Sequence, residues 1–183
     1  MGLISKIKGK LAYWQRGIGL YILKNTQNSL SENGNYNYQE FFQIQSLTDY
    51  DMANEKRKDY ESRFSKGEIL CVLEKDKKII AYGWINPNPN HLIGELVLQL
   101  EYGDKCEVLY DFETDVAYRG KGLYPFLLQR IGNRNHKPKL IYVLVENKSS
   151  IKGIEKAGFR HLGNIYGYNK KKANHLLRKL WQE

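Results

Sequence analysis

The chain has 183 residues, of which 42% are hydrophobic and 27% are charged. This composition is typical of a folded globular protein, and the length fits one domain with a sizeable core. Its 29 lysines and arginines outnumber the 20 aspartates and glutamates, which gives a net charge of +9. Such a surplus suits nucleic acid, anionic lipid or a phosphorylated small molecule as ligand, and charge alone does not choose among them.

Residue spacing argues against a metal site and a membrane span. Cys71 and Cys106 lie far apart, each in an apolar run, as buried core thiols do. No C-x-x-C pattern occurs and the four histidines show no ligand spacing, so we expect no metal. No apolar stretch approaches the ~18 residues that a spanning helix needs, and no signal-peptide pattern is found. A cytoplasmic location is therefore expected.

Residues 1–24 carry five basic side chains and no acidic one. Their apolar residues recur near helical spacing, and Gly9, Gly17 and Gly19 weaken a free-standing helix, so we favour a leading helix packed on its own domain. The alternative is an amphipathic segment that docks on an anionic membrane or a partner. A polar, turn-rich stretch follows, so we divide the chain into an N-terminal segment and linker, a main domain and a C-terminal helix, over residues 1–37, 38–170 and 171–183.

Strand patterns dominate the first part of the main domain. We expect a strand over residues 38–46 and a helix over 52–64. Two strands, over 69–74 and 78–85, should then form a hairpin. A strand over residues 93–102 leads through Gly103-Asp104 to a partner strand over 106–114. The middle of the chain therefore predicts an antiparallel meander.

Helices and strands alternate after Thr114. Residues 123–131 have helical apolar spacing, with Pro125 in the first turn. A buried strand, a helix and a last pair of strands are expected over residues 140–145, 149–157 and 159–168. This alternation implies a parallel strand pair beside the meander, and hence a mixed, mostly antiparallel α/β sheet.

A basic, glycine-rich turn joins the strand that ends at Thr114 to the following helix. Gly120 and Gly122 allow close approach of a ligand to the backbone, and Arg119 and Lys121 add positive charge. Backbone N–H groups at a helix start bind anions, so this turn predicts a phosphate site. Neither the Walker pattern nor the dinucleotide fingerprint fits it.

A second motif, at residues 147–159, follows the buried strand. It resembles the N-x-x-[AS] to G-F segment of the GNAT acetyltransferase superfamily, and Arg119 to Tyr124 resembles the family's [RQ]-x-x-G-x-[GA] pyrophosphate motif. The two motifs together are far more specific than either alone. The resemblance covers roughly residues 38–168.

This resemblance implies a GNAT-like fold in which two parallel strands, over residues 108–114 and 140–145, splay apart. The pantetheine arm of acetyl-CoA, or of another short acyl-CoA, would lie in the gap between them. The residues that the resemblance assigns to this co-substrate are Phe112, Thr114, Arg119, Gly120, Lys121, Gly122, Leu123, Tyr124, Asn147 and Ser150.

Two positions depart from the family pattern. Tyr124 stands where glycine or alanine is usual. Ile154 occupies the position of the tyrosine that protonates the departing thiolate in many members, and isoleucine has no proton to donate. Three alternatives remain. Another tyrosine protonates the thiolate, the thiolate departs without direct protonation, or the protein binds coenzyme A and does not catalyse.

Alternation along the strand before the turn provides the catalytic candidates. Steps of two from Thr114 place Phe112 and Tyr110 on the cleft face, and a bulge would reverse this. Tyr110 is our first acid/base candidate, followed by Glu113 and Asp111. Tyr142 and Tyr166 are further candidates for the acid.

The resemblance therefore predicts an N-acetyltransferase that acts on a primary amine of a small molecule. Sugar-directed members of the family are the most similar, which points to a nucleotide-linked amino sugar in surface polysaccharide synthesis. The alternatives are a non-catalytic acyl-CoA-binding protein and a basic nucleic-acid-binding protein. Dispersed basic residues and the lack of a nucleic-acid-binding motif argue against nucleic acid as partner, and a dimer is left open.

Overall fold

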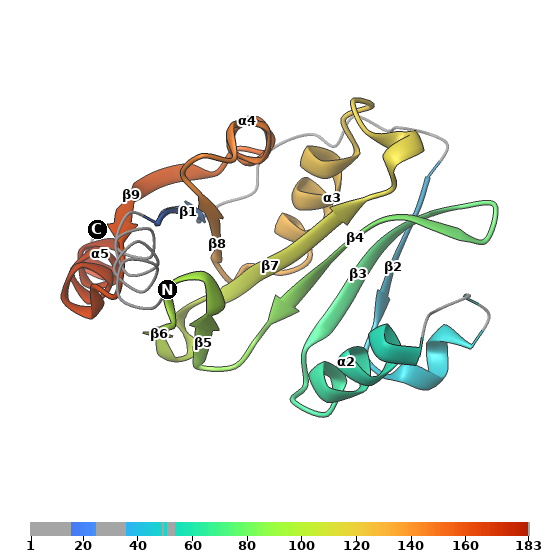
Figure 1. Cartoon of the computed structure of the whole chain (residues 1–183), viewed down its shortest axis with the longest axis horizontal. Coiled ribbons are helices and arrows are strands. Elements are labelled where there is room, and N and C mark those ends of the chain that lie inside the picture. The colour runs from blue at the N-terminus through green and yellow to red at the C-terminus, as the bar shows by residue number, and fades with distance from the viewer. Residues whose placement is uncertain (1–15, 25–35, 49, 51–53, 183) are drawn as a thin grey trace, which may run out of the picture.

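The computed structural model describes residues 16–24, 36–48, 50 and 54–182, and a seven-stranded sheet forms its centre (Figure 1). The strand order is β2-β3-β4-β7-β8-β1-β9, and among the described strands only β7 and β8 pair in parallel. The strands are β1 Gly17–Leu23, β2 Asn37–Phe41, β3 Ile69–Lys75, β4 Lys78–Asn86, β7 Glu107–Thr114, β8 Lys139–Leu144 and β9 Arg160–Tyr166. The predicted mixed α/β sheet with a parallel pair is confirmed.

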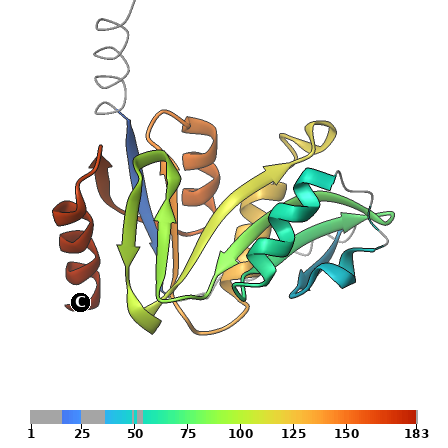
Figure 2. The same ribbon diagram turned by 60° about the horizontal axis from the view of Figure 1, so that its bottom comes forward.

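Both faces of this sheet are covered. Helices α3 (Leu123–Gly132) and α4 (Lys148–Lys156) pack on one face, where they enclose a core with Leu109, Ile141 and Ile154. Helix α2 (Asn54–Phe64), a small hairpin of β5 (Asn90–Ile93) with β6 (Leu98–Glu101), and α5 (Lys170–Gln182) cover the other face, as the turned view in Figure 2 shows. None of the helices in the described part of the chain combines the length and apolar character that crossing a bilayer requires.

Several predicted elements form nearly where the sequence puts them. The three helices expected over 52–64, 123–131 and 149–157 correspond to α2, α3 and α4. The hairpin of β3 and β4 turns through Asp76 and Lys77, whose φ angles of 51° and 62° are those of a type I′ turn. The predicted buried strand over 140–145 is β8.

Three other strands differ from the prediction. Gly17–Leu23, expected to belong to a leading helix in the N-terminal segment, is instead a fully buried strand between β8 and β9. The expected boundary at residue 37 therefore does not separate it from the sheet. Residues 106–114 pair with β4 and β8 instead of with 93–102, because Val97 at φ 49° turns the chain back and β6 pairs with β5. Residues 159–168, where a pair of strands is expected, contain one strand, β9 (Arg160–Tyr166), which pairs with β1. Residues 1–15 lie outside the described residues.

The parallel strands β7 and β8 separate along their length. Their register joins Glu107 to Lys139, Val108 to Leu140 and Leu109 to Ile141. Pairing ends there, although β7 continues to Thr114 and β8 to Leu144. The two strands therefore diverge toward their carboxyl ends, which leaves their facing backbone groups free for a ligand.

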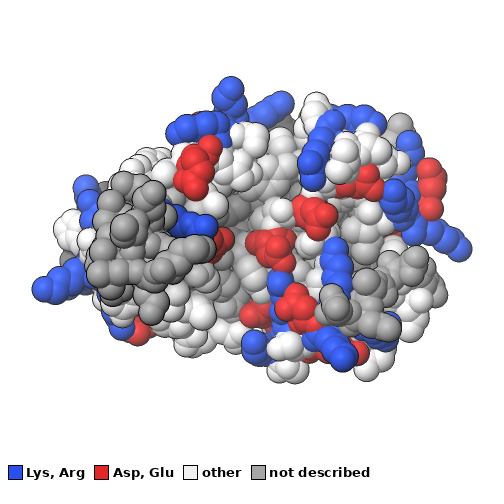
Figure 3. All heavy atoms as spheres, in the orientation of Figure 1, with Lys and Arg blue, Asp and Glu red and all other residues white. Residues whose placement is uncertain are grey.

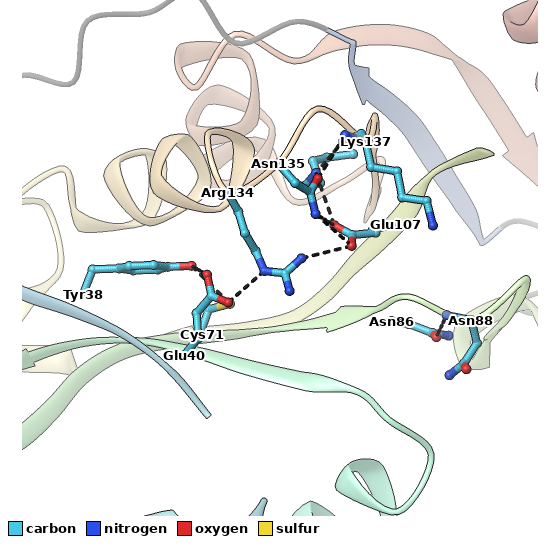
Figure 4. Close-up of polar contacts among 10 residues, drawn as sticks. Tyr38, Glu40, Cys71, Asn86, Asn88, Glu107, Arg134, Asn135 and Lys137 are labelled. Atoms are coloured by element: carbon cyan, nitrogen blue, oxygen red, sulfur yellow. Dashed lines mark hydrogen bonds and ion pairs between the residues drawn. The ribbon is translucent and has the colours of Figure 1, made fainter. Parts of the chain in front are cut away.

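A buried network of charges holds the closed end of this divergence (Figure 4). Glu107 forms ion pairs with Lys139 at 3.2 Å and with Arg134 at 3.1 Å, and Arg134 also pairs with Glu40 of β2 at 2.8 Å. The Lys139 and Glu107 side chains are only 1% and 5% exposed. Burial lowers the pKa of Lys139, and the Glu107 carboxylate offsets part of this effect. Each charge in the network therefore depends on its partners.

Replacing Glu107 with glutamine should destabilise the fold strongly. The substitution keeps the size of the side chain but leaves Lys139 and Arg134 without their shared buried anion, which typically costs about 3 to 5 kcal/mol. Urea denaturation followed by circular dichroism measures this loss. As a matched control, Glu101→Gln removes an exposed ion pair to Lys170 and should leave the midpoint nearly unchanged. Equal midpoints for the two variants would contradict a structural role of Glu107.

Candidate active site

The turn between β7 and α3 is built by local hydrogen bonds. Asp115 accepts from the Ala117 N–H at 2.9 Å and pairs with Lys78 at 2.6 Å. Arg119 donates from Nε to the Thr114 carbonyl at 3.1 Å, which ties the turn back to the end of β7. Gly120 and Gly122 then take φ angles of 75° and 76°, a region that glycine enters without strain.

Unpaired backbone donors gather where α3 begins. Gly122 is the N-cap of this helix and has no side chain with which to cap it. Within the described part of the chain, the backbone N–H groups from Gly120 to Tyr124 have no hydrogen-bond acceptor. Together with the positive end of the helix dipole, these amides form a site suited to an anion such as a diphosphate.

A cavity of about 590 Å³ lies beside this turn, between the end of β7 and α4. All of the residues that sequence reasoning assigned to the co-substrate line it, except Lys121. They are Phe112, Thr114, Arg119, Gly120, Gly122, Leu123, Tyr124, Asn147 and Ser150. Lys121 is exposed and lies over the Tyr118 ring, with its nitrogen 4.7 Å from the ring centroid.

Helix α4 adds positive charge to this cavity. Its Lys152 and Lys156 line the wall, and neither pairs with a carboxylate among the described residues. Figure 3 shows basic side chains along the upper edge of the molecule, over α4 and the turn before α3 as located in Figure 1. The side chain of Asn147 caps α4, because its Oδ1 accepts from the Ser150 N–H at 3.1 Å. Asn147 therefore has a structural role at the cavity wall.

Tyr124, which departs from the family motif, is accommodated by Gly153 of α4. A Cβ atom at Gly153 would lie 2.5 Å from the Tyr124 ring, so only glycine leaves room for it. The same ring meets Phe112 edge to face, with centroids 5.4 Å apart. Ile154, next to Gly153, is completely buried in the core beneath α4. Isoleucine therefore serves packing at this position.

A β-bulge at Asp111 determines which way the β7 side chains point. Tyr82 pairs with Glu113 and Trp84 with Tyr110, so one residue of β4 faces two of β7. Asp111 has a φ angle of 52°, as a bulge residue can. Phe112 consequently packs with the core under α3 and α4, whereas Tyr110 packs on the face of α2. The expectation that Phe112 and Tyr110 share the cleft face is therefore wrong.

A second cavity, of about 660 Å³, opens on the α2 face next to Tyr110. The Tyr110 hydroxyl donates a short hydrogen bond to the Glu68 carboxylate. Burial raises the pKa of Glu68 above its usual value, and the bond from Tyr110 offsets part of this rise. Arg63 also lines this cavity and forms ion pairs with Asp59 at 2.8 Å and with Asp111 at 2.6 Å.

His91 of β5 lies between the two diverging strands on this face. Its ring centroid is 4.6 Å from that of Tyr110 on β7 and 5.6 Å from that of Tyr142 on β8. Its Nε2 is 3.2 Å from the Tyr142 hydroxyl, and its Nδ1 is 3.1 Å from Nδ2 of Asn86. Tyr110 and Tyr142 are the first residues beyond the paired ends of their strands. The three rings therefore border the divergence on the face of the sheet that α2 and the small hairpin cover.

The remaining candidates lie farther from the divergence. Asp111 is exposed and held by Arg63. Glu113 is also exposed, accepts from the Tyr82 hydroxyl at 2.6 Å, and lines both the cavity of about 590 Å³ and a separate hollow that Lys56 also lines. Tyr166 lies on β9, which β1 separates from β8. Of the candidates from sequence, Tyr110 and Tyr142 are thus the two that meet at the divergence.

Glu68, Arg63 and His91 are cavity residues that sequence reasoning did not identify. Arg63 lies in α2, Glu68 follows this helix, and His91 lies in the small hairpin of β5 and β6. All three are therefore remote in sequence from both motifs. The spacing of the histidines predicts no metal site, and no motif around them predicts another role. His91 follows the Pro- and Asn-rich stretch of residues 86–90, and a polar residue in a loop-rich segment was the available signal.

No protein-family model matches the sequence, and no curated protein matches it significantly. Solved structures do resemble the fold. A GNAT-family acetyltransferase from Colwellia psychrerythraea superposes with a TM-score of 0.54 at 17% identity, over 81% of this chain and 53% of the other. An aminoglycoside antibiotic 6'-N-acetyltransferase from Acinetobacter baumannii gives a TM-score of 0.54 at 13% identity, over 74% of this chain and 97% of the other.

A GCN5-related N-acetyltransferase from Sphaerobacter thermophilus gives a TM-score of 0.53 at 12% identity, over 88% of this chain and 54% of the other. The chain therefore spans about half the length of two of these structures and nearly all of the third. At such low sequence identity, the structural similarity establishes the fold alone, and the activity has to be argued from the site. The diverging parallel strands and these structural similarities show that the chain has the fold of the GNAT acetyltransferases.

Proposed function

We propose that the chain is an acyl-CoA-dependent N-acetyltransferase that acts on a primary amine of a small molecule. The observation that carries this proposal is the row of unpaired backbone N–H groups from Gly120 to Tyr124, at a helix start beside diverging parallel strands. A fixed anion site next to free strand edges suits a ligand with a diphosphate at one end and an extended amide chain at the other. Coenzyme A has both parts.

The diphosphate of acetyl-CoA would accept hydrogen bonds from the turn amides, while Arg119, Lys152 and Lys156 add charge around it. The pantetheine arm would extend along β7 past Phe112 and Thr114. Its thioester would then reach the point where β7 and β8 part, beside Tyr110 and Tyr142. The protein thus binds the co-substrate through one cavity and presents the acyl group at the other.

Tyr110 and Glu68 would together remove the proton from the attacking amine. The amine gives a proton to the Tyr110 oxygen as Tyr110 passes its own proton to the Glu68 carboxylate, along the hydrogen bond that already joins them. The raised pKa of Glu68 suits this role, because a stronger base accepts the proton more readily. Asp111 would contribute indirectly by holding Arg63. Glu113 lines the co-substrate cavity, and its carboxylate accepts from Tyr82.

The acceptor would enter through the cavity of about 660 Å³ on the α2 face. Its walls carry amide, carboxylate, guanidinium and imidazole groups, which suit a ligand rich in hydroxyl groups. We extend the proposal to an amino sugar, nucleotide-linked in surface polysaccharide synthesis, because the net charge of +9 would favour an anionic carrier.

Acetyl-CoA should raise the melting temperature of the protein and bind with measurable affinity in calorimetry, since a ligand that binds only the folded state stabilises it. Gly122→Val should reduce that affinity at least about tenfold, because valine is strained at the φ of 76° on which the turn amides depend. Gly103→Val is the matched control, since Gly103 has a φ of 61°, equally open space and no part in this cavity. Unchanged affinity in Gly122→Val would overturn the loop assignment.

Failure to bind acetyl-CoA, combined with salt-dependent retention on immobilised nucleic acid, would instead support a nucleic-acid-binding protein. Binding without thiol release, across a panel of amino sugars and their nucleotide-linked forms, would support a non-catalytic acyl-CoA-binding protein.

Glu68→Gln should lower kcat by about 100-fold with little change in the KM for acetyl-CoA, because glutamine cannot accept the proton. In the unsubstituted protein, kcat should fall as the pH is lowered through the raised pKa of Glu68, since only the carboxylate is a base. The variant should lose this acidic limb. Thiol release with the best acceptor of the panel, measured against pH, tests both points. An acidic limb that persists in Glu68→Gln would exclude Glu68 as the base.

A further inference from the structure

The proposed reaction, on which this inference rests, requires a proton for the departing sulfur. When the amine attacks the thioester carbonyl carbon, a C–N bond forms, and collapse of the intermediate breaks the C–S bond with its electron pair going to sulfur. Thiolate departure is easier if an acid delivers a proton to that sulfur. Ile154 stands where the resemblance places a tyrosine, is fully buried and has no proton to give. Another residue must supply it.

The orientation of the Asn86 side chain is determined by two backbone partners. Its Oδ1 accepts from the Asn88 N–H at 2.9 Å, and its Nδ2 donates to the Asn90 carbonyl at 2.9 Å (the Asn86–Asn88 contact is drawn in Figure 4). An N–H group can only donate and a carbonyl can only accept, so the amide of Asn86 cannot be reversed. Its Nδ2, which faces His91, is therefore a donor.

This orientation sets the tautomer of His91. Nδ1 lies 3.1 Å from the Asn86 donor and must accept, so the proton of the neutral ring resides on Nε2. Burial lowers the pKa of His91 to about 4, with a smaller contribution from the nearby charge of Arg63. The ring is therefore neutral near pH 7. Its Nε2–H then donates to the Tyr142 oxygen, 3.2 Å away.

The proton of Tyr142 is left available as a result. Its oxygen receives the bond from His91, and among the described residues its own O–H has no acceptor. Burial raises the pKa of Tyr142, so its hydroxyl stays protonated throughout the pH range of the activity assays. A phenol whose oxygen already accepts an N–H bond gives up its proton more readily, because the same bond stabilises the phenolate.

Tyr142 also lies where the sulfur would be. It follows Ile141, the last residue of β8 that pairs with β7, as Tyr110 follows Leu109 on the other strand. The His91 ring contacts both tyrosines. Base and acid would thus face the thioester from opposite sides of the divergence, with His91 between them.

We propose that Tyr142 is the catalytic acid of this protein. His91 and Asn86 are positioning residues, which orient the Tyr142 hydroxyl so that it can donate its proton. Together the three residues replace the tyrosine that many members of the family have at the position of Ile154. In the step, the Tyr142 O–H bond breaks, its proton passes to sulfur to give the thiol, and the electron pair stays on the Tyr142 oxygen. The amine proton ends on Glu68. Exchange with water then returns Glu68 to the carboxylate and Tyr142 to the phenol.

The tautomer of His91 can be measured without any activity. In a ¹⁵N–¹H long-range correlation spectrum at pH 7, with the signals of His91 assigned from their loss in His91→Phe, we expect Nε2 protonated and Nδ1 unprotonated. Asn86→Leu should remove this preference. A protonated Nδ1 in the unsubstituted protein would overturn the proposal, whether or not acetyl-CoA binds.

Kinetics test the acid itself. Hydroxylamine at saturating concentration serves as the probe acceptor, because it is small and uncharged at pH 7, with thiol release from acetyl-CoA as the readout. Tyr142→Phe should lower kcat by about 100-fold with the KM for acetyl-CoA within about twofold. Tyr168→Phe, at an exposed tyrosine outside these cavities, is the matched control and should leave kcat unchanged.

A double-mutant cycle separates positioning from packing. His91→Phe keeps a ring between the tyrosines but removes the N–H, and should lower kcat in the unsubstituted protein but cause no further loss in Tyr142→Phe. Losses that multiply would mean that His91 acts through packing alone. A large fall in kcat in Tyr124→Phe, with none in Tyr142→Phe, would assign the acid to the other cavity. Calorimetry with acetyl-CoA on every variant keeps a failure of binding distinct from a failure of proton transfer.

Discussion

The ion pair between Glu107 and Lys139 is the constraint on which the architecture of the site depends. It joins the first residues of the two parallel strands in a nearly water-free position, where leaving either charge alone is costly. Arg134 extends the hold to Glu40 on β2. The strands are therefore tied firmly at one end, and their divergence at the other end leaves backbone and aromatic groups open to ligands. A purely apolar contact would fix this register less strictly.

The bulge at Asp111 lets a single strand serve both faces of the sheet. On one side of the bulge Tyr110 faces α2, and on the other Phe112 faces α3 and α4, although only one residue separates them. A regular strand would point both side chains the same way. The two cavities that we assign to the acyl donor and to the acceptor can therefore lie on opposite faces and still meet where β7 and β8 part.

Residues with strong local signals could be predicted from sequence, and residues placed by distant contacts could not. The turn from Arg119 to Gly122 and the apolar run of β8 carry their own signatures, and both lie where expected. Strand β1 was missed because Gly17 and Gly19 weaken its pattern, and these glycines make room for the Tyr166 and Tyr21 rings. His91 and Glu68 gained their roles only through the fold, since no motif connects them to Tyr110.

The position of β1 has a consequence for how the protein is made. Ile18 pairs with Leu144 on one side and with Ile165 on the other, so β1 leaves the ribosome well before the two strands that it pairs with, β8 and β9. The long segment between β1 and its partner strands must lose conformational entropy before the stabilising contacts form, which slows folding. Until then β1 is an apolar strand with both edges unpaired, a surface that chaperones would bind or that could aggregate during synthesis.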